Sequence, residues 1–167
     1  MARTVTLNQV RQVQAIPQSV AAHAIRRIAH PTNFSTESGS ALSWAIKLAG
    51  ENHAELLLLH VLPPPTPLFE LESPMKSEAE LALSILLANL EKAGITARGF
   101  LLTDKNSIDS QIVHAARVER VDLIIMGTRG RTGISRLLCG SVACRVITRA
   151  HCPVVVVPGR NYHPTLL

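Results

Sequence analysis

The chain has 167 residues, 47% of them hydrophobic, which is enough for one domain with a sizeable core, and its longest apolar run falls far short of the about 18 residues that a membrane-spanning helix needs. With 17 Lys and Arg against 12 Asp and Glu the net charge is +5, but the basic residues form no continuous run, and one Trp, one Tyr and three Phe are few for stacking on bases, so we do not expect nucleic-acid binding. Three cysteines, an odd number, in a chain whose first residues show no apolar export signal favour a cytoplasmic protein.

Residues 1–24 are expected to form an N-terminal extension. They carry charged side chains only at Arg3 and Arg11 and alternate weakly between polar and apolar residues at positions 4–7. This pattern fits an added edge strand or an arm that packs on a partner subunit, and it fits a loosely ordered tail equally well. Both interpretations stay open at this point.

From residue 25 onward, strand patterns and helix patterns alternate along the chain. The strand-type segments are apolar at nearly every position, which is typical of strands buried on both faces of a parallel sheet. Because a parallel sheet needs a crossover between strands, the helices between them are expected to cover both of its faces. The five predicted strands lie at residues 25–30, 54–62, 95–103, 121–126 and 154–157.

Four segments with apolar residues at helical spacing lie between these strands. The first helix can be capped by Ser35 or Thr36 and is expected to stop at Gly50. The other three helices are expected at residues 74–93, 107–117 and 142–150.

Several side chains receive specific predictions. The second helix is expected to bury Leu81, Ile85 and Leu90. His60, at the end of the second strand, is interpreted as a hydrogen-bonded residue rather than a catalytic one. Residues 63–74 contain five prolines, which predicts a stiff loop beside the site that is long enough to act as a lid.

A glycine-rich loop joins the fourth strand to the last helix. Gly127 and Gly130 are separated by two residues, nine more follow, and Gly140 comes directly before Ser141. Gly127 and Gly130 can take positive φ and let backbone N–H groups approach phosphate oxygens. The helix start after Gly140 offers free N–H groups, a partial positive charge and the Ser141 hydroxyl to an anion. The spacing differs from that of the P-loop and of the dinucleotide fingerprint, but it predicts a phosphate-binding loop. The alternative is that these glycines only form turns.

The stretch DLIIMGTRGRTGISRLLCGSVACRVITRAHCPVVVVP, at residues 122–158, resembles the universal stress protein family, and in particular its ATP-binding branch with the motif G-x-x-G, nine residues, G-[ST]. IRRIAHPTNFS, at residues 25–35, is similar to the family's opening strand followed by P-T-D-F-S. The resemblance covers residues 25–158 and implies a universal stress protein domain at 25–160 with a C-terminal tail at 161–167. The expected fold is an α/β single domain, an open parallel five-stranded sheet of order 3-2-1-4-5 with helices on both faces, like that of the adenine nucleotide alpha hydrolases.

In this topology the loops after the first and fourth strands leave in opposite directions and open a crevice at the carboxyl ends of the strands. The resemblance implies that the backbone of Val61 bonds the adenine edge. Asn33 stands where the family has an acid, so it lacks the negative charge that could hold a ribose hydroxyl or help bind a metal. The expected nucleotide-binding residues are Pro31, Thr32, Asn33, Val61, Met126, Gly127, Arg129, Gly130, Gly140, Ser141 and Val142.

The expected function is that of a cytoplasmic universal stress protein that binds ATP, or ADP or AMP, with any Mg²⁺ held by the phosphates. It is expected to act in the stress response as a homodimer whose shape or partner choice responds to nucleotide. The resemblance implies dimerisation through the edge strand Val154, Val155, Val156 and Val157, although the N-terminal arm could cover that strand instead.

Two other functions remain open. A slow ATPase or phosphotransferase could use Arg129 and Ser141, but neither site loop contains an acidic residue to act as a base, so no catalytic residue and no metal ligand is assigned. The other alternative is an adaptor dimer that binds no nucleotide.

Overall fold

The computed structural model describes residues 24–62, 74–103, 106–128 and 140–159. Strands and helices alternate throughout these ranges, as the sequence predicts. The elements are β1 (Arg27–Pro31), α1 (Thr36–Asn52), β2 (Glu55–Val61), α2 (Pro74–Lys92), β3 (Ala97–Leu102), α3 (Ile108–Val118), β4 (Leu123–Thr128), α4 (Ser141–Arg149) and β5 (Val154–Pro158).

The strands form one parallel sheet in the order β3-β2-β1-β4-β5, which confirms the predicted topology. In the middle of the sheet, Ile28 of β1 lies between Leu56 of β2 and Leu123 of β4. The chain therefore leaves β1 toward one edge of the sheet and later leaves β4 toward the other. The carboxyl ends of these two adjacent strands form the switch point at which open α/β sheets bind ligands.

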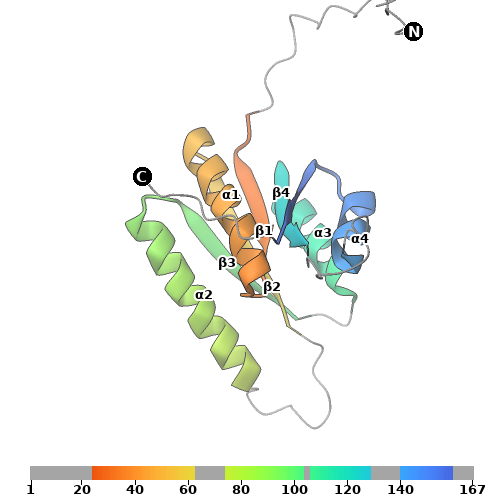
Figure 1. Cartoon of the computed structure of the whole chain (residues 1–167), viewed down its shortest axis with the longest axis horizontal. Helices are drawn as coiled ribbons and strands as arrows, with labels where there is room; N and C mark the ends of the chain where they lie inside the picture. Colours follow the sequence, from red (N-terminus) through yellow and green to blue (C-terminus); the bar gives the residue numbers. More distant parts are fainter. Residues whose placement is uncertain (1–23, 63–73, 104–105, 129–139, 160–167) are drawn as a thin grey trace, which may run out of the picture.

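The sheet is the middle of three layers, with α1 and α2 on one face and α3 and α4 on the other (Figure 1). Alternate residues of a strand point to opposite faces, so Leu56 and Leu58 pack against α1 and α2, whereas Leu57 and Leu59 pack against α3 and α4. Both faces are covered, which explains why the central strands are apolar at most positions. Within the described ranges, no helix has the length and apolar character needed to cross a membrane.

The first helix begins as expected but ends later. Ser35 is its N-cap, and its hydroxyl accepts a hydrogen bond from the Ser38 N–H at 3.3 Å. The predicted end at Gly50 is wrong, because the helix continues to Asn52. It stops where His53 takes a left-handed backbone with φ of 51° and donates its N–H to the last carbonyls, the role usually given to glycine.

The predicted buried face of α2 is wrong at two of its three residues. Leu90 is buried at 2% exposure, but Leu81 and Ile85 are 62% and 54% exposed. The helix packs on β3, an edge strand that offers only a narrow surface, and Leu83 reaches the sheet at Gly99. Helical spacing identified apolar residues correctly, but the position of the helix at the sheet edge decides which of them are covered.

The two edge strands differ in character. At the β3 edge, Arg98 donates to Glu55 at 2.6 Å and to Glu119 at 2.7 Å, so charge is concentrated there. The β5 edge consists of valines, and Val155 is 39% exposed. Charged residues on an edge strand discourage pairing with another chain, whereas an apolar edge favours it.

Candidate functional site

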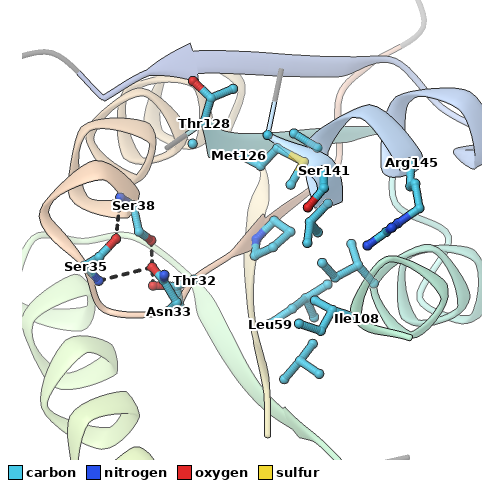
Figure 2. Close-up of a pocket in the computed structure, with 17 residues that line it drawn as sticks. Thr32, Asn33, Ser35, Ser38, Leu59, Ile108, Met126, Thr128, Ser141 and Arg145 are labelled. Carbon is cyan, nitrogen blue, oxygen red and sulfur yellow. Dashed lines mark hydrogen bonds between the residues drawn. The ribbon is translucent and has the colours of Figure 1, made fainter. Parts of the chain in front are cut away.

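A cavity of about 450 Å³ lies at the carboxyl ends of β1, β2 and β4 (Figure 2). The β1–α1 loop, the ends of β2 and β4, and the first turns of α3 and α4 all contribute to its wall. This is the predicted switch point between β1 and β4. Its volume is in the range of small-molecule binding sites.

Every expected site residue within the described ranges lines this cavity, and the two segments that supply most of them are far apart in the sequence. Arg129 and Gly130 lie outside the described residues. The expected residues that line the cavity are Pro31, Thr32, Asn33, Val61, Met126, Gly127, Gly140, Ser141 and Val142.

Sequence reasoning missed other lining residues. The inner stripe of α3 contains Ile108 and Ile112, but nothing in the sequence shows that this stripe reaches the site. Arg145 gave no sequence signal at all, because its place depends on how α4 packs beside α3. The missed residues are Ser35, Ser38, Leu59, Ile108, Ile112, Thr128, Ala143 and Arg145.

The β1–α1 loop is held in a defined shape. The Thr32 N–H donates to the Leu59 carbonyl at 2.9 Å, and His60 Nδ1 donates to the Thr32 carbonyl at 2.9 Å, which confirms that His60 is a hydrogen-bonded residue. Phe34 has a left-handed backbone with φ of 58°, an arrangement that costs a non-glycine residue ~1 kcal/mol. Its N–H bonds Thr32 Oγ1 at 3.1 Å and its ring stacks on His60 at 4.6 Å. These contacts fix the wall of the cavity before any ligand arrives.

Asn33 presents a hydrogen-bond donor at this wall. Its Oδ1 accepts from the Ser35 N–H at 3.2 Å, as Figure 2 shows. Since a backbone N–H can only donate, this bond identifies the Oδ1 atom, which keeps one lone pair, and leaves both N–H groups of Nδ2 for a ligand. The residue can therefore donate to an acceptor atom of a ligand, but it carries no negative charge.

A buried histidine connects this wall to the core. His30 has no exposed surface, and burial lowers its pKa to about 4 although its hydrogen bond to Ile125 acts in the opposite direction, so the ring is neutral at pH 7. Its Nδ1 donates to the Ile125 carbonyl at 2.9 Å, and Nε2 must then accept from Ser38 Oγ at 3.4 Å. Ser38 Oγ in turn accepts from Thr32 Oγ1 at 2.8 Å. The chain of bonds sets the orientation of the Thr32 hydroxyl.

The opposite wall includes the end of β4 and the start of α4. Gly127 is part of β4 and pairs with Val157 of β5, so its backbone is that of a strand. The positive φ expected for Gly127 is therefore wrong. Gly140 is the N-cap of α4 and brings no side-chain capping bond. The first N–H groups of α4, the helix dipole and the exposed Ser141 hydroxyl are thus directed at the cavity. This end suits an anionic group.

Arg145 is the one charged side chain among the described lining residues. Its Nε donates to Asp109 Oδ1 at 2.9 Å, and Arg149 Nη1 donates to Asp109 Oδ2 at 2.6 Å. Asp109 has no exposed surface, and its burial opposes ionisation. Hydrogen bonds from Arg149 and Ser107 and the charge of Arg145 nevertheless hold the pKa of this carboxyl below its usual value. The pair of arginines therefore meets a charged carboxylate.

No carboxylate lines the described part of the cavity, and no cluster of three or more His, Cys, Asp or Glu side chains among the described residues could hold a metal ion. The polar groups that do line the cavity are mainly donors: the Asn33 amide, the α4 N-terminus, Ser141 and Arg145. The described wall therefore suits a ligand rich in acceptor oxygens and nitrogens, and it gives a metal ion no charged protein ligand.

Comparison with known proteins agrees with this geometry. Residues 24–158 match the profile of the Universal stress protein family. The chain is 37% identical over 140 residues to Universal stress protein MJ0531 of Methanocaldococcus jannaschii, and the alignment covers 79% of this chain and 81% of that protein. The solved structure of MJ0577 is similar with a TM-score of 0.70 and 29% identity, covering 83% of this chain and 99% of that one.

The universal stress protein of Archaeoglobus fulgidus in complex with dAMP has the same fold, with a TM-score of 0.62, 22% identity, and coverage of 79% of this chain and 96% of that one. The match to the family profile extends over most of the chain and includes every described residue that lines the cavity. The chain therefore belongs to the universal stress protein family.

Proposed function

We propose that this chain is a regulatory universal stress protein that binds an adenine nucleotide, ATP or its products ADP and AMP, in the cavity between β1 and β4. The observation that carries the proposal is that all expected site residues within the described ranges line one donor-rich cavity. Proteins of the same fold, 17% to 22% identical, have been solved with dAMP, with cAMP and, from Arabidopsis thaliana, with AMP.

Each end of the cavity has a role in this proposal. The phosphates meet the N–H groups at the start of α4 and the Ser141 hydroxyl, and Arg129 and Gly130, outside the described residues, are expected to complete this part. The main chain of Val61 contacts the edge of the base. Because the described wall holds no carboxylate, any Mg²⁺ would be held by the phosphates, and binding of AMP would not need it.

The regulatory unit in this proposal is a homodimer joined along β5. Its exposed valine edge can pair with the same strand of a second copy, and β5 also pairs with β4, whose end lines the cavity. A nucleotide that contacts the end of β4 would therefore act next to the dimer interface.

Calorimetric titration of the full chain with ATP, ADP and AMP, with and without Mg²⁺, tests the binding. We expect saturable binding, and at a ligand concentration of about 100 times Kd the nucleotide should stabilise the fold by about 2.7 kcal/mol and raise Tm. Ser141→Ala should weaken nucleotide affinity about tenfold, because it removes a hydrogen bond to a charged group. Gly130→Val should block binding while leaving the melting curve of the free protein unchanged.

The same experiment separates the alternatives. A wild-type chain that is dimeric, gives no binding heat and shows no shift in Tm would contradict the proposal and favour the adaptor dimer. Phosphate release from ATP that Ser141→Ala abolishes would favour the slow ATPase. The described cavity offers no side-chain carboxylate to act as a base for that reaction.

A further inference from the structure

One arginine occupies a position in the cavity that no sequence motif assigns. Figure 2 shows Arg145 on the α4 side, across the cavity from Thr32, Asn33 and Ser38. The residue lies four positions after Ser141, about one helical turn, so both face the same cavity. Its guanidinium reaches toward the first turn of α3, where it bonds Asp109.

Asp109 fixes the position of the Arg145 guanidinium through one nitrogen atom and leaves the other two available to a ligand. Arg145 donates through Nε to Asp109, and its two Nη groups make no hydrogen bond within the described part of the chain. Arg149 binds the other oxygen of the same carboxylate and also Ser110, at 3.0 Å, and it does not line the cavity. The carboxylate thus holds two arginines of equal exposure, of which one faces the ligand space.

Charge and surroundings indicate what this guanidinium would contact. The ionised Asp109 lies within hydrogen-bonding distance of it, which reduces its attraction for a phosphate, whereas the α4 N-terminus is opposed by no described carboxylate in the cavity. The nearby part of the wall is apolar and comes from α3 and β2. A flat, neutral ring with acceptor nitrogens fits an apolar wall beside a planar donor group better than a phosphate does. The apolar residues concerned are Leu59, Ile108 and Ile112.

We propose that Arg145 recognises the base of the bound nucleotide: its Nη groups donate to a ring nitrogen of the purine, while the α3 isoleucines pack against the ring. Purine ring nitrogens such as N7 are acceptors of this kind. The inference rests on the proposed function, because it assigns one end of the same cavity to the base and leaves the phosphates to the α4 N-terminus. Asp109 sets the direction of the guanidinium through its bond to Nε.

Two ligands distinguish a base contact from a phosphate contact. Adenosine carries the base without a phosphate, and AMP carries both. In calorimetric titrations of the full chain, Arg145→Gln should weaken the affinity for adenosine and the affinity for AMP by the same factor, about tenfold. Arg145→Lys keeps a positive charge that can pair with Asp109 but loses the planar, forked guanidinium. It should therefore weaken the affinity for both ligands nearly as much.

Arg149→Gln is the matched control. It breaks the neighbouring bond to the same carboxylate without touching the cavity wall, so both affinities should stay within about twofold of the wild type. Equal losses in Arg149→Gln and Arg145→Gln would overturn the inference, because disruption of the ion pair would then explain them. A loss confined to AMP would also overturn it and place Arg145 at the phosphate.

The failure of this inference differs from the failure of the proposed function. If the wild-type chain binds AMP and adenosine, and Arg145→Gln and Arg145→Lys bind them equally well, only the role of Arg145 is wrong. If the wild-type chain binds neither ligand, the nucleotide site itself is wrong, and the inference is wrong with it. Thermal melting of each variant shows whether it is folded. If Arg145→Gln does not fold, Arg145→Lys replaces it in the comparison of adenosine with AMP.

Discussion

At the scale of single residues, the buried His30 links stability to pH. Burial lowers its pKa from 6.5 to about 4 in the folded chain. Between these values the unfolded chain binds a proton that the folded chain excludes. The stability contributed by the neutral ring is therefore complete above pH 6.5 and is lost as the pH falls toward 4, by about 3 kcal/mol in total.

His30→Asn tests this contribution, because the asparagine amide can still donate to the Ile125 carbonyl but does not titrate. Urea unfolding from pH 7 to 4 should show the wild type losing more stability than the variant, by up to about 3 kcal/mol at pH 4. Carboxylates titrate in both proteins, so the difference between the two curves isolates the histidine. Parallel curves would mean that His30 titrates alike in the folded and the unfolded chain, so that burial does not shift its pKa.

At the scale of elements, α2 approaches β3 through a glycine. A Cβ at Gly99 would lie 2.6 Å from Cδ2 and 2.7 Å from Cγ of Leu83, too close for either side chain to stay in place. Gly99→Ala should therefore destabilise the chain by about 1 to 3 kcal/mol, as overpacking does. In the double variant with Leu83→Ala the clash disappears, so the two changes should cost less together than the sum of their separate effects in urea unfolding.

Gly39 of α1 provides the comparison. A Cβ there meets nothing within 4 Å, so Gly39→Ala should be neutral or stabilise the helix, by up to about 1 kcal/mol. If Gly99→Ala proves as harmless as Gly39→Ala, α2 is free to shift on the sheet edge and the close packing is not needed.

At the scale of the whole molecule, the sheet has one charged edge and one apolar edge. Arg98 and its acidic partners occupy the β3 side, and valines form β5. We expect a dimer along β5, which Val155→Lys should convert to a monomer in sedimentation experiments, because a charge on an edge strand opposes pairing. The monomer should keep the fold and the binding of AMP.

Thr96→Lys, an exposed change just before β3, is the control for added charge at a sheet edge and should leave the dimer intact. A wild-type chain that sediments as a monomer would remove the dimer from the proposed function. So would a Val155→Lys variant that remains a dimer, since the contact would then lie elsewhere.

Local patterns in the sequence determined the architecture. The alternation of apolar runs with helical spacing, and the glycines around the last crossover, are properties of neighbouring residues. They sufficed for the strand order, and every expected site residue within the described ranges lines one cavity. Boundaries were less exact: Gly50 does not end α1, and Gly127 belongs to β4.

Only the tertiary structure decided which side chains from different elements meet. Leu81 and Ile85 are exposed because α2 sits on an edge strand, a fact absent from their spacing. Asp109 and Arg145 come together through the packing of α3 against α4. His30 of β1 forms hydrogen bonds to Ser38 of α1 and Ile125 of β4, so three elements meet at this histidine. Periodicity reports how one element is built, whereas such contacts depend on the distances between elements, which are fixed only when the layers pack.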